Sequence, residues 1–218
     1  MLSVLSLLET RVLGVLLEKE RTVPDTYPLT LNTLIAGCNQ KTSRDPIIAA
    51  SETQVQTAID SLKRMNLVIE SSGGRVPRYT HNFERVLHVP RQSSAILAVL
   101  MLRGPQTAGE LRINCERLHA FSDISSVEGF LNELAERPDG ALVVELPRQA
   151  GSRENRWAHL LSGPPVVPDS PALAAAPDAG GYGISELAAV KASVARLEAE
   201  VADLKALVSR MAAELGIS

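Results

Sequence analysis

The stretch that most constrains the fold, residues 51–80, combines a helical repeat with a hairpin signature. Ser51 is followed three residues later by Gln54, the spacing of a capping box that satisfies free N–H groups at a helix start. Beyond this cap, one apolar stripe recurs at helical spacing and leaves the other faces polar. The stripe comprises Val55, Ala58, Ile59, Leu62 and Met65. The stretch therefore predicts an amphipathic helix.

A two-stranded hairpin is expected directly after this helix. Asn66 suits the left-handed conformation that ends many helices, and the apolar run 67–69 suits a short buried strand. Gly73 and Gly74 then turn the chain into a return strand at residues 78–80. A helix followed by a hairpin with a basic tip is typical of the second half of a winged helix. That half is a binding device with no catalytic constellation.

Two further helices are expected before this stretch. Ser6 and Glu9 have capping-box spacing for a first helix that ends near Lys19. Thr30 suits the N-cap of a second helix whose inner face reaches Cys38. The order helix, helix, helix, strand, wing, strand is thus complete within the first 86 residues.

The same order of signals recurs further along the chain. A short apolar helix at residues 93–103 is followed by two capping boxes, Thr107 with Glu110 and Ser125 with Glu128. The spacing of the stripe repeats at Val127, Phe130, Leu131 and Leu134, and residues 142–144 match 67–69. An internal duplication explains this recurrence, and each copy is expected to close a small core of its own.

The chain ends in two segments of different composition. Residues 163–184 are rich in Pro, Ala and Gly and predict a disordered linker. Residues 185–218 then carry a heptad pattern whose apolar positions favour a parallel two-stranded coiled coil and hence a homodimer. The alternative is a single amphipathic helix that folds back on the body. The predicted dimerisation residues are Leu187, Val190, Val194, Leu197, Val201, Leu204, Val208, Met211 and Leu215.

The predicted fold class is therefore mainly α with small β-hairpins (α+β), in four segments. A first winged-helix domain spans residues 1–86 and a second spans 87–162. The linker at 163–184 and the coiled-coil helix at 185–218 complete the chain. No uncharged apolar run approaches the length of a membrane span, so a cytoplasmic protein is expected.

Several short motifs together resemble the YceH-like family of uncharacterised bacterial proteins over roughly residues 5–160. The resemblance implies two tandem winged-helix domains and a bacterial cytoplasmic setting, but no activity and no site residues. Its most specific part is the run at residues 39–46. The residues that carry it are Glu18, Lys19 and Glu20; Tyr27, Pro28 and Leu29; Cys38, Asn39, Gln40, Lys41, Thr42, Ser43, Arg44, Asp45 and Pro46; and Arg75, Val76, Pro77, Arg78 and Tyr79.

The polar face of the helix at residues 51–65 is the candidate interface with double-stranded DNA. In DNA-binding winged helices the third helix enters the major groove and the wing contacts the backbone. Basic residues in the preceding loop and on the hairpin would neutralise phosphates. The predicted DNA-binding residues are Lys41, Arg44, Gln56, Thr57, Lys63, Arg64, Arg75 and Arg78. The alternative is an ordinary solvated helix face.

The remaining polar features favour structural roles. The loop at residues 39–45 suits either a ligand site or self-bonded loop structure, and the second is favoured. The second domain exposes Glu128, Glu133 and Glu136 on its third helix, which favours contact with protein over DNA. The two cysteines are too few and too far apart for a disulfide framework or a zinc site. The net charge of −3 does not suggest a protein that coats nucleic acid.

These patterns together predict a non-enzymatic, dimeric DNA-binding protein without cofactor or metal, with transcriptional regulation as its expected role. The alternative is a protein–protein scaffold or adaptor that uses its winged helices to hold protein partners. No nucleophile elbow, phosphate-binding loop or paired carboxylates occur in the sequence.

Overall fold

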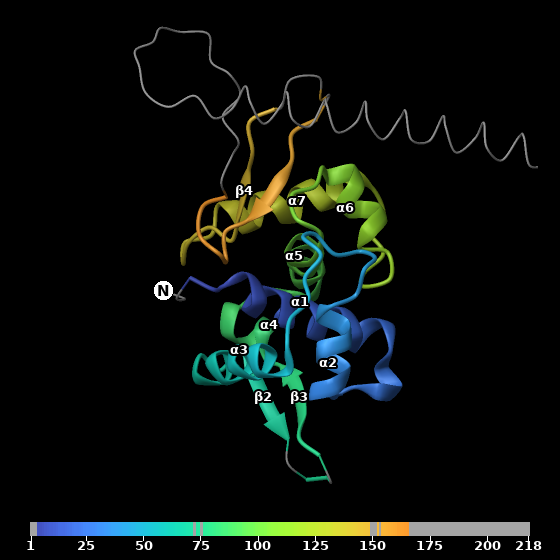
Figure 1. Ribbon diagram of the computed structural model, residues 1–218. Coiled ribbons are helices and arrows are strands. Elements are labelled where there is room, and N and C mark those ends of the chain that lie inside the picture. Colours follow the sequence, from blue (N-terminus) through green and yellow to red (C-terminus); the bar gives the residue numbers. More distant parts are fainter. Residues whose placement is uncertain (1–3, 72, 75, 149–151, 153, 166–218) are drawn as a thin grey trace, which may run out of the picture. The chain divides into compact units, whose positions relative to one another are not determined.

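The computed structural model describes residues 4–71, 73–74, 76–148, 152 and 154–165, which form one compact unit of helices and small antiparallel sheets (Figure 1). The predicted α+β class is confirmed. The predicted coiled-coil helix at 185–218 and all but the first three residues of the predicted linker lie outside the described residues.

The first half of the unit contains four helices and a three-stranded sheet of order β1-β3-β2. The capping boxes predicted at Ser6 and Ser51 are both present, and Thr30 accepts a hydrogen bond from the Thr33 N–H. Asn66 has a φ of 58°, as expected for a residue just beyond a helix end. The elements are α1 (Leu7–Thr22), η1 (Pro24–Thr26), β1 (Leu29–Thr30), α2 (Leu31–Cys38), α3 (Glu52–Arg64), β2 (Val68–Ser71), β3 (Arg78–His81) and α4 (Phe83–Leu87).

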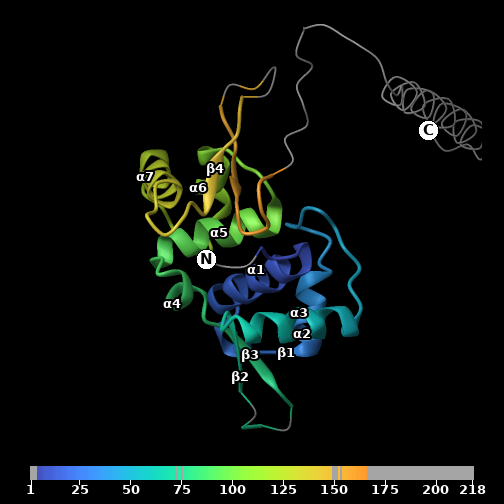
Figure 2. The ribbon, with the colours of Figure 1, turned by 90° about the vertical axis from the view of Figure 1, so that its left-hand side faces the viewer.

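The second half repeats the order of three helices and a hairpin. Its elements are α5 (Arg91–Arg103), α6 (Ala108–Asn114), α7 (Ile124–Ala135), β4 (Val143–Glu145) and β5 (Trp157–His159). In place of β1, the single residue Gln106 bridges to Trp157 on β5. In Figure 1 and Figure 2 alike, the two hairpins leave the central helices in opposite directions.

The backbone hydrogen bond that follows the third helix and the register of the hairpin are the same in the two halves. The Leu67 N–H donates to the Leu62 carbonyl at 2.9 Å. The Leu142 N–H donates to the Leu134 carbonyl at the same distance. Val68 pairs with His81 across the first hairpin, and Val143 with His159 across the second. The hairpin registers define equivalent positions on the strands, and the helix caps and buried stripes define them on the helices. The equivalent pairs are Leu31 and Ala108, Gln56 and Glu128, Thr57 and Gly129, Asp60 and Asn132, Lys63 and Ala135, Arg64 and Glu136, Glu70 and Glu145, Arg78 and Arg156, and Tyr79 and Trp157.

The two halves share one hydrophobic core, because α1 and α5 pack against each other at its centre. Every residue at 10–17 of α1 and at 93–102 of α5 is buried. A helix that is buried all round must be covered by both halves at once. The expectation that each copy closes its own core is therefore wrong for the described residues, which form one continuous cluster.

Three local expectations also differ from the structure. The capping box predicted at Ser125 is wrong: Asp123 caps α7 by accepting from the Ser126 N–H at 2.7 Å, so Ser125 lies inside the helix. The first helix runs on to Thr22 rather than ending near Lys19. Helix α4 and strand β1 were not expected, because each is too short to show a periodic pattern.

Candidate nucleic-acid interface

Helix α3 and the β2–β3 hairpin form the outer end of the first half (Figure 1 and Figure 2). The inner stripe of α3 is buried as predicted, with the side chains of Val55, Ile59 and Leu62 fully covered. Thr57 and Arg64 are exposed on the opposite face, and Gln56 and Lys63 are half-buried at its edge. In the structure, the α3 residues of the candidate set therefore lie on the outward face of the helix or at its edge.

Arg44 does not belong to this surface. Its side chain is buried, and its two terminal nitrogens donate to the two carboxylate oxygens of Glu18 at 3.1 and 2.7 Å. Arg44 also donates to the Gly37 carbonyl at 3.1 Å. A guanidinium held in this way cannot reach a DNA phosphate without breaking a buried ion pair. Arg44 is therefore corrected from a candidate DNA contact to a structural residue.

The loop at residues 39–46 uses its polar groups inside the molecule. Asn39 exchanges two hydrogen bonds with the backbone of Ala50, at 2.9 and 2.7 Å. The Ser43 hydroxyl accepts from Arg103 at 2.9 Å, and the Pro46 carbonyl accepts from the buried Arg11 at 2.7 Å. These bonds tie the loop to α1 and to the end of α5. They support the structural interpretation of the loop.

Two residues on the outward face of α3 are engaged by neighbouring acids. Lys63 forms an ion pair with Glu70 on β2. The Gln56 amide donates to the Asp60 carboxylate at 3.0 Å. A DNA phosphate would have to replace Glu70 at Lys63, so this lysine contributes less than a free cation would.

The basic residues around the hairpin differ in how they are held. Arg78 is exposed, and one of its terminal nitrogens donates to the Pro28 carbonyl at 2.8 Å and to the Thr26 carbonyl at 3.4 Å. A guanidinium has five N–H donors, so this nitrogen uses only part of them. Lys41 and Arg64 are exposed, and within the described residues neither has a side-chain partner. Arg75 lies outside the described residues. Lys63 and Arg64 on α3 and Arg78 on the hairpin are therefore the described cations of the candidate surface. Lys41 lies on the loop that is bonded to the end of α5, so the structure does not bring it to this surface.

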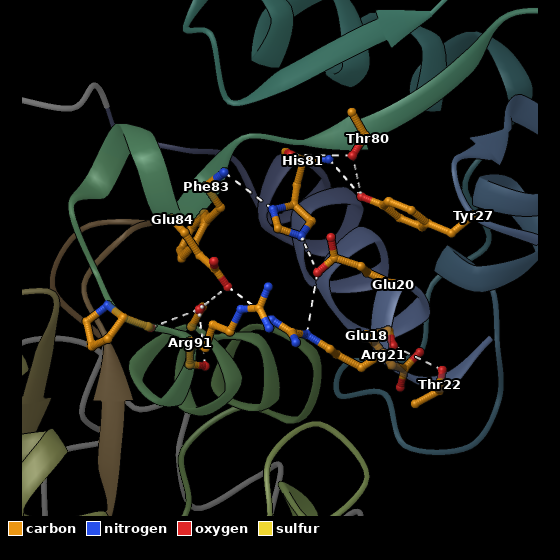
Figure 3. A network of polar contacts seen from close by, with 12 residues as sticks. Glu18, Glu20, Arg21, Thr22, Tyr27, Thr80, His81, Phe83, Glu84 and Arg91 are labelled. Carbon is orange, nitrogen blue, oxygen red and sulfur yellow. Dashed lines mark hydrogen bonds and ion pairs between the residues drawn. The ribbon is translucent and has the colours of Figure 1, made fainter. Parts of the chain in front are cut away.

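A polar network that sequence reasoning missed joins the base of the hairpin to α1 and α5 (Figure 3). His81 Nε2 lies 3.1 Å from a Glu20 carboxylate oxygen, and its backbone N–H donates to the Tyr27 hydroxyl at 2.9 Å. Arg21 reaches Glu84 at 3.3 Å, and Glu84 accepts from Ser94 at 2.9 Å. The network anchors the hairpin, and no spacing in the sequence indicates it.

Both cysteines are core residues. Cys38 and Cys115 occupy equivalent positions in the two halves and are fully buried. Burial raises the pKa of each thiol to about 12, so neither is ionised at neutral pH. Among the described residues, no three His, Cys, Asp or Glu side chains are grouped to hold a metal ion. No described helix combines the length and the apolarity that crossing a membrane requires.

The outward face of the second half is acidic. Glu128, Glu133 and Glu136 are exposed on or beside α7, as predicted. On the second hairpin, Arg156 donates to Glu110 at 2.9 Å and to the Pro105 carbonyl at 2.7 Å. The latter contact is the counterpart of the bond from Arg78 to Pro28. The duplicated frame is therefore retained, whereas the outward charges differ.

The comparison with known families and proteins agrees with the resemblance noted in the sequence. The family described as "Protein of unknown function, DUF480" matches residues 5–152. A UPF0502 protein of Dechloromonas aromatica is 63% identical over 204 residues, which cover 94% of this chain and 94% of that protein. A UPF0502 protein of Methylibium petroleiphilum is 61% identical over 216 residues, covering 99% and 92%. One of Burkholderia ambifaria is 58% identical over 214 residues, covering 96% and 89%.

Proposed function

The chain belongs to the DUF480 family of bacterial UPF0502 proteins, and we propose that it is a non-enzymatic protein that binds double-stranded DNA. In this proposal each half is a winged-helix module, with α3 and the β2–β3 hairpin as the DNA-contacting pair. The protein acts in the cytoplasm as a homodimer joined by its C-terminal heptads, in a role such as transcriptional regulation.

The order of elements supports the winged-helix assignment. Each half has three helices, the third of which leads into a two-stranded antiparallel hairpin. The short strand β1, which immediately precedes α2 in the sequence, pairs with β3 of the hairpin. This pairing joins the hairpin to the helical body. In proteins of this class the third helix enters the major groove while a strand or wing contacts the backbone.

The single observation that carries the DNA proposal is a difference in charge at equivalent positions. On the outward face of the third helix, the first half has Gln56, Lys63 and Arg64. The second half has Glu128, Ala135 and Glu136 at the same places. Because the frame around them is the same, this difference concerns what each face contacts rather than how it folds. Only the first face suits phosphates.

The number of available cations predicts weak binding by one protomer. With Arg44 buried and Lys41 on the loop that is bonded to the end of α5, Lys63, Arg64 and Arg78 are the described cations on this side. If all three contact phosphates, the logarithm of the binding constant falls with the logarithm of salt concentration at a slope of about −3. A dimer that places two such faces on one duplex would roughly double this slope. Tight binding therefore depends on the predicted dimer.

The test is a fluorescence anisotropy titration of a labelled 30-base-pair duplex at several salt concentrations. Arg78→Ala is compared with Arg156→Ala, which removes the equivalent frame contact in the second half. Arg78→Ala is expected to weaken binding and to lower the magnitude of the salt slope by about 1. Arg156→Ala is expected to leave both unchanged. Equal effects of the two substitutions, or no binding of wild-type protein at low salt, would refute DNA binding by this face.

The second candidate is a protein scaffold or adaptor, and the acidic face of α7 favours it. Glu128, Glu133 and Glu136 repel DNA but suit a basic protein surface. A stoichiometric partner protein that co-purifies after nuclease treatment, together with absent duplex binding, would favour the scaffold over the DNA-binding protein.

A further inference from the structure

The second half contains a hollow of about 410 Å³ between its last two helices and its hairpin. Trp157 and Ala108 line its inner part, and Ile124, at the start of α7, lines its edge. Four charged side chains and one amide complete the lining: Glu128, Glu145, Arg148, Glu154 and Asn155. This hollow lies far from the first half's DNA-contacting pair, because the two hairpins extend in opposite directions (Figure 1).

The first half has different side chains at positions equivalent to the lining of the hollow. Leu31 stands where the second half has Ala108, whose side chain is a single methyl group. Tyr79, the counterpart of Trp157, directs its hydroxyl toward the Gln56 amide oxygen at 3.5 Å. Lys63 pairs with Glu70, and its counterpart Ala135 does not line the hollow. Among these positions, Ala108 is the one at which a smaller side chain borders the hollow.

The rim of the hollow carries an excess of negative charge. Three glutamates line it, Glu128, Glu145 and Glu154, against one arginine, Arg148. Among the described residues, none of these glutamates has a lysine or arginine within ion-pair distance. Asn155 donates to Glu145 at 2.9 Å and so orients one carboxylate at the rim. Such a rim attracts cationic side chains and repels nucleic acid.

Beside the rim, apolar side chains face the solvent. Ile113 on α6 is 69% exposed and Ile124 is 45% exposed. Gly109 lies one helical turn before Ile113, and a Cβ on it would be 3.9 Å from Ile124 Cδ1. The same Cβ would lie 3.9 Å from Glu154 Oε2, so this part of α6 borders both the isoleucine and the acidic rim. Apolar side chains rimmed by charge are typical of a protein contact surface.

We propose that this hollow is the docking site for a protein segment that presents an apolar side chain flanked by lysine or arginine. The apolar side chain packs on Ile124 and the edge of Trp157, and the cations face Glu128 and Glu154. The partner's basic character follows from charge complementarity with the rim. This inference does not depend on DNA binding by the first half.

The chain's single tryptophan makes the proposal directly testable, since Trp157 lines the hollow. The probe is an unlabelled synthetic peptide with two central leucines flanked on each side by two arginines. The control peptide carries glutamate in place of each arginine. Titration of the basic peptide into the full-length protein is expected to shift Trp157 emission with saturation, whereas the acidic peptide leaves it unchanged.

Variants then separate the docking site from general electrostatics. Glu128→Gln combined with Glu154→Gln is expected to weaken peptide binding about tenfold. Ile124→Ser is expected to weaken it by a similar factor, because it removes apolar contact area. Glu133→Gln is the matched control, since it removes one exposed charge from α7 outside the hollow. It is expected to keep wild-type affinity.

Three outcomes would overturn the proposal. The first is the absence of any saturable emission change with the basic peptide up to millimolar concentration. The second is equal weakening by Glu133→Gln and by the double substitution, which would indicate nonspecific charge attraction. The third is a Trp157 shift caused by protein concentration alone, which would place a second copy of the chain in the hollow.

Discussion

Gly14 and Leu102 are in contact across the boundary between the two halves, where α1 meets α5. A Cβ atom on Gly14 would lie 2.8 Å from Leu102 Cγ and 2.9 Å from Leu102 Cδ2. Real Cβ atoms are not found so close to other heavy atoms, so the two helices approach each other through the missing side chain. The shared core therefore depends on a glycine in the middle of a buried helix.

Gly14→Val is expected to lower the free energy of unfolding by about 1–3 kcal/mol or more, because the new side chain must push α1 away from α5. The measurement is urea denaturation followed by circular dichroism. Gly129→Ala is the matched control: Gly129 is also helical, but a Cβ there meets nothing within 4 Å. It is expected to stabilise by up to about 1 kcal/mol. Destabilisation by both substitutions would contradict the role of the close approach.

Removing one member of the Arg44–Glu18 pair is expected to destabilise strongly. Glu18→Gln leaves the buried guanidinium without its charge partner, which typically costs about 3–5 kcal/mol. Lys41→Ala, three residues from Arg44 but exposed, is the control and should change stability by less than about 0.5 kcal/mol. Equal unfolding midpoints for Glu18→Gln and wild type would show that the pair contributes nothing.

The same pair predicts a loss of stability in acid. Burial alone would raise the pKa of Glu18, but the hydrogen bond and charge of Arg44 outweigh burial and hold the pKa below its ordinary value of 4.5. The stabilisation is therefore present above pH 4.5 and is lost as the pH falls through the lowered folded-state value. In Glu18→Gln this part of the pH dependence should disappear.

His159 predicts a separate pH dependence at a higher range. Burial lowers the pKa of His159 from 6.5 to about 4, so the folded state keeps the imidazole neutral. The unfolded chain takes up a proton below pH 6.5, and stability should fall from there to about pH 4, by up to about 3 kcal/mol. Denaturation curves of His159→Leu across this range should be flatter than those of wild type. A slope for His159→Leu equal to that of wild type would contradict this assignment.

Deleting residues 185–218 is expected to convert a dimer into a monomer, because the heptad pattern supplies the predicted interface. Sedimentation equilibrium of the full-length and shortened proteins measures the change. Substituting Val201 and Leu204 by serine in the full-length chain tests the same stripe without shortening it. A shortened protein that still sediments as a dimer would place the interface in residues 1–184.

Much of the frame follows from local patterns in the sequence. The capping boxes at Ser6, Ser51 and Thr107 each join two residues three apart, so their chemistry is visible in a short window. The buried stripe of α3 and the matching stripe of α7 follow from helical spacing. The recurrence of the pattern also indicated that two copies of one unit are present.

Contacts between residues that lie far apart in the sequence could not be predicted from local patterns. Arg44 and Glu18 are 26 positions apart, and nothing local distinguishes this arginine from an exposed one. The burial of α1 and α5 on all sides likewise depends on how two copies meet. The hollow beside Trp157 is lined by residues of two helices and a hairpin, among them Ala108, where the first copy has the larger Leu31.

The burial of α1 and α5 on every side also bears on how the two copies were able to diverge. A helix covered by both halves has no face on which a substitution is without consequence for packing. Helices α3 and α7 each have one free face, and changes there leave the frame intact. Changes of charge between the two halves are therefore compatible with the shared core where they fall on the outer faces of α3 and α7, as at Gln56 and Glu128.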